Sequence, residues 1–89
     1  MKIDIKKATA EDLKNLGVSS WSSWSCDVSE FDWEYDCDER CYIQEGKVIV
    51  TTAGGEEVEI NKGDLVLFPK GLKCRWQVVE PVRKVYRFE

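Results

Sequence analysis

The second half of the chain consists of short runs of β-branched and aromatic residues separated by turn sequences, and this pattern limits the fold to an all-β class. Turns at 53–56, 61–64 and 69–71 each contain Gly or Pro, which suit the backbone angles of a tight reversal. Many short strands with little helix favour a sandwich or barrel, because closing or doubling a sheet leaves few exposed edges. The predicted strands are 41–52, 57–60, 65–68, 73–79 and 82–88.

The first part of the chain predicts one helix and two further strands. Thr9 followed by Asp12 is typical of a helix start, and Gly17 is typical of a helix end. Segments 21–26 and 30–36 have the composition of strands, and the three residues between them predict a hairpin turn. No repeat or linker interrupts the chain.

Size and charge narrow the possible functions. At 89 residues the chain is near the size at which one core can just support itself, so we expect a single domain over residues 1–89. The 17 acidic residues outnumber the 13 basic ones, giving a formal charge of -4. This charge disfavours attraction to the phosphates of nucleic acid or to anionic membranes. We therefore expect neither as a partner.

The start of the chain and its cysteines suggest a compartment. The chain contains no run of about 20 apolar residues, and its first residues lack the apolar stretch of a signal peptide. We therefore expect a cytoplasmic protein with mostly reduced thiols. No CxxC pair occurs, so the thiols do not form a recognisable zinc motif. The cysteines are Cys26, Cys37, Cys41 and Cys74.

Two spacings stand out in the chain: Glu39-x6-Gly46 and Gly63-x5-Pro69-x-Gly71-x2-Cys74-x3-Val78. They resemble the two conserved motifs of cupins and together cover about residues 33–78. The run 76–86 further resembles the small cupin-3 family, which contains ureidoglycine aminohydrolase domains. The resemblance implies a cupin double-stranded β-helix, that is, a jelly-roll barrel, with a site for a small molecule inside.

The usual metal ligands of cupins are largely replaced. Typical cupins hold Mn, Fe, Zn or Ni through two histidines and a glutamate of the first motif and one histidine of the second, yet this chain has no histidine. Counting back from Glu39, the first two histidine positions fall on Trp33 and Tyr35. A spacer one residue longer would place them on Asp32 and Glu34 instead.

The last histidine position falls on Cys74, so Glu39 alone keeps its family identity. A catalytic metal usually needs about three protein ligands, and an indole is not a useful one. A thiolate site that joins Cys74 to Cys37 and Cys41 stays open as an alternative. We nevertheless predict no tightly bound metal and no cofactor.

Strand alternation predicts which side chains face inward. Trp76 should share the inward face of Cys74, and Cys41 that of Glu39. If a turn lies near 36–38, Trp33 and Tyr35 should lie on the strand next to Glu39. Core packing alone would explain the aromatic residues, but a carboxylate in an apolar barrel is costly unless it is paired, hydrogen-bonded or protonated. This cost favours a functional role for Glu39. The predicted catalytic residues are Glu39 and Cys74, and the predicted substrate-binding residues are Trp33, Tyr35, Cys41, Trp76 and Lys84.

The leading functional hypothesis is a small-molecule-binding cupin, either a binder or an enzyme in which Glu39 transfers a proton. The family resemblance suggests a small polar or nitrogen-containing ligand. The alternative is a non-catalytic ligand-sensing or structural module, and cupins commonly form homodimers. Arg83, Lys84 and Arg87 most simply form a solvated strand face, although Lys84 or Arg83 could orient an anionic ligand.

Overall fold

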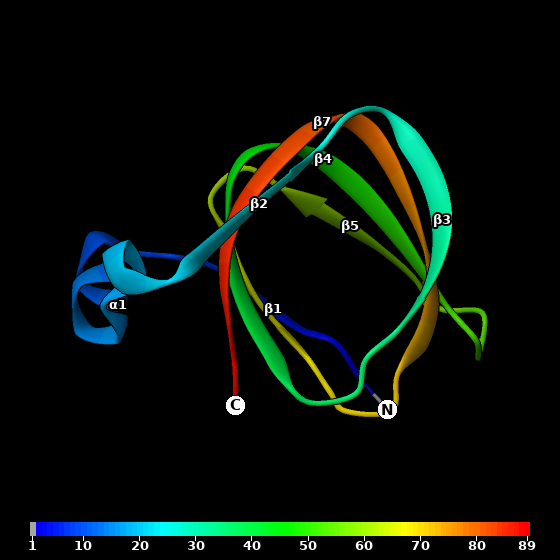
Figure 1. Cartoon of the computed structure of the whole chain (residues 1–89), viewed down its shortest axis with the longest axis horizontal. Coiled ribbons are helices and arrows are strands. Elements are labelled where there is room, and N and C mark those ends of the chain that lie inside the picture. Colours follow the sequence, from blue (N-terminus) through cyan, green and yellow to red (C-terminus); the bar gives the residue numbers. More distant parts are fainter. Residues whose placement is uncertain (1) are drawn as a thin grey trace.

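Two long antiparallel strands, β4 (Glu39–Thr52) and β7 (Lys73–Phe88), connect the two layers of the fold. The computed structural model describes residues 2–89. The two strands pair with each other over most of their lengths and curve together around the interior (Figure 1). Each of them therefore contributes to both layers.

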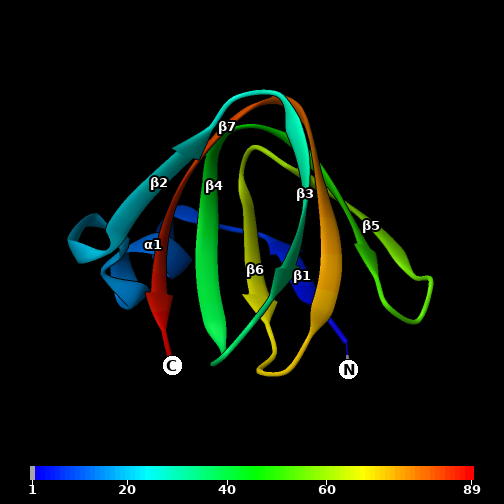
Figure 2. The ribbon, with the colours of Figure 1, turned by 45° about the vertical axis from the view of Figure 1, so that its right-hand side comes forward.

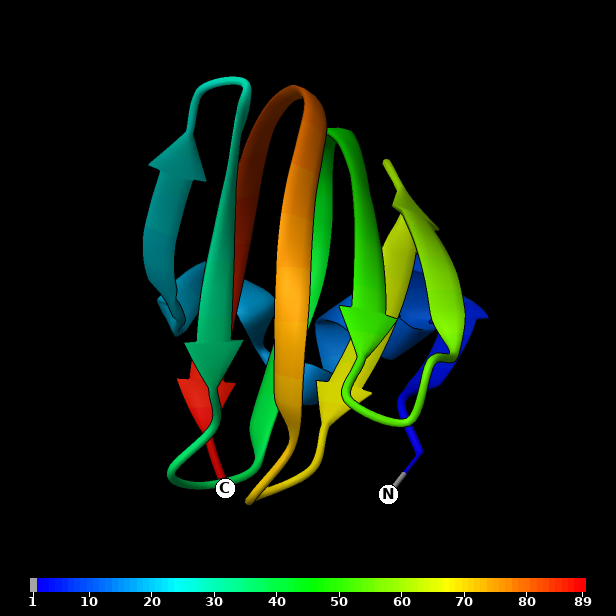
Figure 3. The same ribbon diagram turned by 90° about the vertical axis from the view of Figure 1, so that its right-hand side faces the viewer.

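Five shorter strands extend these layers through antiparallel pairing. One path runs β1-β6-β4-β7-β2, while β5 pairs with β4 and β3 pairs with β7. Figure 2 shows the strands curving around the interior, and Figure 3 shows β2 and β3 on one side of the central pair and β5, β6 and β1 on the other. The all-β prediction is confirmed. The short strands are β1 (Asp4–Lys7), β2 (Ser22–Cys26), β3 (Ser29–Glu34), β5 (Glu57–Asn61) and β6 (Asp64–Phe68).

The long strands bend where Gly46 meets Pro81. Gly46 has a φ of 96°, and a Cβ atom added there would lie 2.3 Å from the carbonyl oxygen of Pro81, so only glycine fits this position. The β4–β7 register shifts around this contact. The predicted separation of 73–79 from 82–88 is wrong, because proline is tolerated at such an irregularity and the strand continues through it.

A short helix, α1 (Ala10–Leu16), lies outside the curved strands (Figure 1). Its start is a capping box, in which Thr9 Oγ1 accepts a hydrogen bond from the Asp12 amide and Asp12 Oδ2 accepts one from the Thr9 amide. Gly17 ends the helix with a φ of 66°, as predicted. A 3-10 helix, η1 (Val18–Ser20), follows. Within residues 2–89, no helix is long and apolar enough to cross a membrane.

The predicted hairpin of 21–26 with 30–36 is wrong. Both segments form strands, but β2 pairs with the C-terminal part of β7, whereas β3 pairs with its N-terminal part. The connection at Asp27 and Val28 therefore carries the chain from one layer to the other instead of reversing it within one sheet. A turn signal in the sequence does not distinguish these two outcomes, since both need a sharp change of direction.

The interior has a filled aliphatic region on the side of β5 and β6. Its members are almost completely buried and pack against one another across β4, β5, β6 and the first part of β7. The alternation of buried and exposed residues along β7 confirms that Cys74 and Trp76 face inward. The aliphatic residues are Ile43, Val48, Val50, Ile60, Val66 and Val78, each no more than 1% exposed.

Candidate functional site

The other half of the interior contains a cavity of about 250 Å³ between the two layers. Its walls come from β2, β3, β4 and β7, together with Tyr35, which directly follows β3. Seven of the lining side chains are aromatic, and the remaining two are charged. The lining residues are Trp24, Phe31, Trp33, Tyr35, Glu39, Trp76, Lys84, Tyr86 and Phe88.

A buried ion pair forms the polar part of this cavity. Lys84 Nζ donates a hydrogen bond to Glu39 Oε2 at 2.6 Å, and both side chains are only 7% exposed. The two residues are not opposite each other in the ladder, since Glu39 faces Phe88 and Lys84 faces Ile43. The long lysine side chain therefore reaches along the sheet to the carboxylate. Pairing offsets the high cost of burying either charge alone.

Aromatic rings surround the Lys84 ammonium. Its Nζ atom lies 4.9 Å from the ring centroid of Trp76 and 5.1 Å from that of Trp24. Tyr86 and Phe68 follow at 5.6 and 5.9 Å. A cation is attracted to the negative face of such rings, and the attraction strengthens when water is excluded. The rings therefore attract the Lys84 ammonium group to this place.

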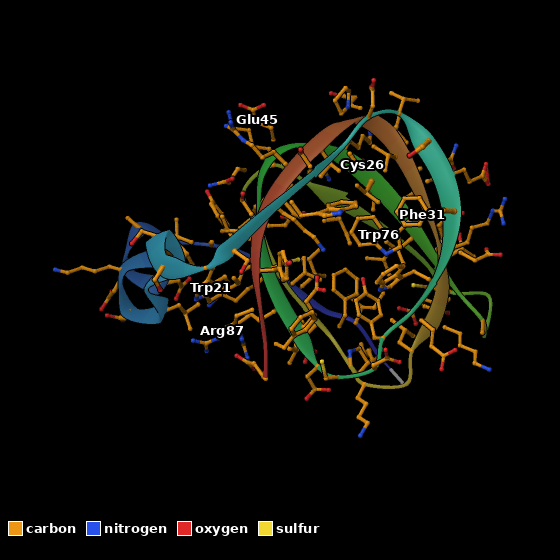
Figure 4. The ribbon with its side chains drawn as sticks, in the orientation of Figure 1. Trp21, Cys26, Phe31, Glu45, Trp76 and Arg87 are labelled. Atoms are coloured by element: carbon orange, nitrogen blue, oxygen red, sulfur yellow. The ribbon has the colours of Figure 1, made fainter. Side chains whose placement is uncertain are left out.

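Contacts between aromatic rings hold the side chains of the cavity walls in place. Phe31 and Trp76 stack with centroids 6.0 Å apart and an interplanar angle of 17°. Tyr35 and Phe68 stack at 4.8 Å and 7°, and Trp24 meets Trp76 edge-on at 5.9 Å. Figure 4 shows Phe31 and Trp76 inside the curve of the strands. These contacts hold flat surfaces in fixed orientations on several sides of the cavity.

Tyr35 is positioned by the corner that carries the second motif. Its amide donates a hydrogen bond to the carbonyl of Leu72, and its carbonyl accepts one from the amide of Gly71. Burial raises the pKa of the Tyr35 phenol far above its usual range, and the nearby Glu39 carboxylate adds to this effect. The phenol is therefore protonated at neutral pH and available as a hydrogen-bonding group.

One buried donor in the cavity wall has no partner. Trp76 is 2% exposed, and within the described part of the chain its indole Nε1 has no hydrogen-bond acceptor. Burial raises the pKa values of Tyr35 and Cys74, and the nearby Trp76 N–H partly opposes this rise in both, although its geometry with either group falls short of a hydrogen bond. Buried donors are nearly always satisfied in folded proteins, so the Trp76 N–H is an exception.

The thiols predicted for the site lie outside the cavity. Cys41 is completely buried in the hydrophobic core, and burial raises its pKa to about 12. Cys74 contacts the carbonyl oxygen of Trp33 at 3.6 Å and borders a separate surface groove, and burial raises its pKa as well. Both thiols are therefore protonated at neutral pH and face no ligand space in the cavity.

The remaining predicted residues do come together. Tyr35, Glu39, Trp76 and Lys84 line the cavity, and Trp33 lies at its rim with 53% of its surface exposed. The expectation that Trp33 and Tyr35 lie on the strand next to Glu39 is wrong, because β3 pairs with β7 and not with β4.

Sequence reasoning missed four lining residues: Trp24, Phe31, Tyr86 and Phe88. Tyr86 and Phe88 follow Lys84 at intervals of two along β7, so the alternation of the strand could have identified them. Trp24 and Phe31 were missed because the sequence predicted a hairpin between their strands. They meet edge-on with ring centroids 6.4 Å apart, although β2 and β3 belong to different layers.

The cavity does not match the metal chemistry of typical cupins. Among residues 2–89, no group of three or more His, Cys, Asp or Glu side chains is placed to hold a metal ion. The one retained ligand, Glu39, is bound by Lys84, whose ammonium brings a positive charge where a metal ion would otherwise compensate the carboxylate. The residues present therefore do not fit a metal centre.

A family model described as the EutQ-like cupin domain matches residues 13–86. The chain belongs to the EutQ-like cupin family. The predicted cupin barrel is thereby confirmed, together with the placement in the cupin-3 family. A search of proteins with curated functions found no significant match.

Solved structures of similar proteins support this placement. The chain is 58% identical to a DUF861 family protein from Thermotoga maritima, with a TM-score of 0.97 over 99% of this chain and 100% of that one. It is 28% identical to the Clostridium difficile EutQ protein, with a TM-score of 0.65 over 72% of this chain and 50% of that one. This EutQ-like cupin thus spans about half the length of the Clostridium EutQ chain.

A third structure shows the fold alone. A putative ethanolamine utilization protein Q from Salmonella typhimurium shares 24% identity, with a TM-score of 0.65 over 97% of this chain and 68% of that one.

Proposed function

We propose that this cupin domain binds a small polar metabolite in the aromatic cavity, with the Glu39–Lys84 pair orienting it. The main support for this proposal is the buried Glu39–Lys84 ion pair, which lies beside the unfilled aromatic cavity. A buried pair often contributes less to stability than well-packed hydrophobic residues of the same volume would. A mostly apolar pocket with a few convergent polar groups is the usual form of a small-molecule site.

The pair also gives the cavity a means of proton transfer. The Glu39 carboxylate is a base that can take a proton from a bound ligand, and the neighbouring Lys84 ammonium can stabilise negative charge that develops on the ligand. Cys74 has no part in this proposal, because it lies outside the cavity. Binding without turnover, as in a ligand sensor, would use the same orienting contacts.

The name of the Salmonella relative would suggest ethanolamine as a ligand. At neutral pH ethanolamine is a cation, and the aromatic cage of this cavity already holds the Lys84 ammonium. A second cation would be repelled there. The proposal for this chain therefore does not include ethanolamine.

The test compares two charge pairs that join the same two strands. Wild-type protein is screened against a panel of small polar and nitrogen-containing metabolites by thermal shift, and hits are measured by calorimetry. The Glu39→Gln/Lys84→Met double variant removes the buried pair without leaving an isolated charge. The control is Glu45→Gln/Arg83→Met, which removes an exposed pair with a 2.8 Å contact.

Hits should bind wild type and the control equally and lose most of their affinity in the cavity variant. A panel without hits, or hits that bind all three proteins equally, would contradict the proposal. Turnover is followed in the same samples by mass spectrometry. A product formed by wild type and not by Glu39→Gln would assign the proton transfer, and unchanged ligand would favour a sensor.

A further inference from the structure

Lys84 gives the cavity a nucleophile. Among the described residues that line the cavity, Lys84 alone carries an amine, the group that reacts with aldehydes and ketones to form an imine. Lysines that carry out this chemistry in proteins are usually partly or fully desolvated. Lys84 meets this condition, because its side chain is only 7% exposed. Imine formation further requires that the amine meets the ligand, loses a proton and leaves a product that the cavity can hold.

The groups around the Lys84 Nζ atom border the same empty space. Three of the surrounding rings also line the cavity: Trp76 at 4.9 Å, Trp24 at 5.1 Å and Tyr86 at 5.6 Å from Nζ to the ring centroid. Glu39, which accepts the hydrogen bond of Nζ, lines it as well. The amine nitrogen is therefore in position to meet a ligand that enters the cavity.

Glu39 can take the proton that the ammonium must lose. The hydrogen bond from Lys84 Nζ to Glu39 Oε2 is 2.6 Å long, so a proton can pass directly from the ammonium to the carboxylate. The transfer leaves a neutral amine beside a neutral carboxylic acid. Both buried charges disappear together, so neither is left without its partner.

Imine formation then balances within the pair. The Lys84 amine nitrogen forms a bond to the carbonyl carbon of the ligand, and a proton moves from this nitrogen to the carbonyl oxygen to give a carbinolamine. The Glu39 carboxylic acid next protonates the hydroxyl group, whose C–O bond breaks to release water. The nitrogen lone pair forms the C=N bond. The sum converts the ammonium and a carbonyl compound into a protonated imine and water, and no oxidant or reductant is used.

The product keeps the charge balance of the cavity. A protonated imine carries one positive charge, as the Lys84 ammonium did, and the Glu39 carboxylate is regenerated beside it. A neutral carbonyl compound therefore adds no buried charge, whereas a cationic or anionic ligand would leave one uncompensated. The rings that attract the ammonium also attract the protonated imine, because both are cations.

From these contacts, and resting on the proposed function, we infer that Lys84 binds a small neutral aldehyde reversibly as an imine. An aldehyde has a single substituent on its carbonyl carbon, which suits a cavity of about 250 Å³, just below the usual range for drug-sized ligands. Phe31 and Trp76 present stacked rings in the cavity wall. Flat apolar groups pack well against such surfaces, so the substituent is a single flat group.

The first experiment traps the imine on the wild-type protein. Benzaldehyde is the probe, and sodium cyanoborohydride reduces any imine to a stable secondary amine. Peptide mass spectrometry locates each modified lysine, which gains the mass of the aldehyde less one oxygen atom. The matched control is Lys47, which pairs with Glu59 at 2.8 Å while their side chains are 34% and 55% exposed. Lys84 should react at least about tenfold faster than Lys47 and every other lysine.

The second experiment measures binding without the reductant. Calorimetry compares benzaldehyde with benzyl alcohol, which has nearly the same shape and no carbonyl group. Wild type should bind benzaldehyde at least about tenfold more tightly, because the imine bond adds to the contacts that both probes make. Lys84→Arg keeps a positive charge for Glu39 but forms no imine, so it should bind both probes equally. Lys47→Arg is the control and should bind them as wild type does.

The outcomes separate the two proposals. If Lys84 reacts no faster than Lys47, or if wild type binds the two probes equally, the imine is wrong. The binding function still stands in that case if the metabolite panel gives hits that Glu39→Gln/Lys84→Met loses, and it is wrong as well if the panel gives none. The trapping experiment needs no variant, so it decides the imine even if Lys84→Arg does not fold.

Discussion

The two halves of the interior differ in their side chains and in how completely these fill the space. On the side of β5 and β6, aliphatic side chains such as Val48 and Ile60 fill the interior, and the buried Asp64 carboxylate at the start of β6 accepts a hydrogen bond from the Asn61 amide. On the side of β2 and β3, the interior contains a cavity, an ion pair and an unpartnered indole N–H. The filled half has the composition that stabilises small domains, whereas the hollow half has features that oppose folding unless something binds there.

Removing one partner of the ion pair in the hollow half should therefore lower the stability of the protein strongly. Glu39→Gln leaves the Lys84 ammonium buried at 7% exposure without a counter-charge. We expect the free energy of unfolding to fall by about 3–5 kcal/mol. Urea denaturation measures this effect.

The Glu39→Gln/Lys84→Met double variant should recover most of that loss or exceed wild-type stability, because no charge is left buried. Equal stabilities for Glu39→Gln and the double variant would show that the uncompensated lysine is not the cause of the loss. Buried charge would then not explain why the hollow half is more sensitive to substitution than the filled half.

Alkaline pH should act on the buried acidic groups beside the cavity. Burial raises the Cys41 pKa to about 12, although the Lys84 ammonium partly opposes this rise. Between about pH 9 and pH 12 the unfolded chain loses the thiol proton while the folded chain keeps it, so stability decreases as pH rises. The expected slope from this thiol is about 1.4 kcal/mol per pH unit. The raised pKa of Tyr35 adds to the loss at higher pH.

Urea denaturation at several pH values from 8 to 10.5 measures this slope. Cys41→Ala should reduce it, because the variant has no thiol to ionise at that position. An identical pH dependence in wild type and Cys41→Ala would contradict the assignment to Cys41.

The difference between the halves also explains what the sequence could predict. Spacing and alternation placed Glu39 and Trp76 inside correctly, because both depend on local strand geometry. The sequence did not reveal the Glu39–Lys84 contact, because it depends on the β4–β7 register across the irregularity at Gly46 and Pro81.

The aromatic walls of the cavity could also be predicted only in part from the sequence. Placing Trp24 beside the cavity required knowing that its strand leaves the layer of β3, and local propensity carries no information about this. The family resemblance predicted the barrel and the loss of the metal ligands, but it contained no sign of the ring cage around the ammonium.

A small change in the filled half should have a modest and purely structural effect. Ile60→Val removes one methylene group from a completely buried site on β5. The expected loss is about 0.5–1.5 kcal/mol of unfolding free energy, with unchanged affinity for any ligand of the cavity. Denaturation and calorimetry on the same variant measure both quantities. A loss of affinity comparable to that of Glu39→Gln/Lys84→Met would show that the two halves are coupled.

The smallest effect is expected on the outer face of the central strands. Arg83 precedes Lys84 on β7, and its side chain contacts Glu45 at 2.8 Å, but Arg83 and Glu45 are 56% and 59% exposed and Glu45 points away from the interior (Figure 4). Water and salt screen such a pair, so Arg83→Met should cost at most about 1 kcal/mol, and less in high salt. Because Glu45 becomes solvated when its partner is removed, no buried charge results. Denaturation at low and high salt measures the effect, and a loss as large as that of Glu39→Gln would show that burial is not what separates the two pairs.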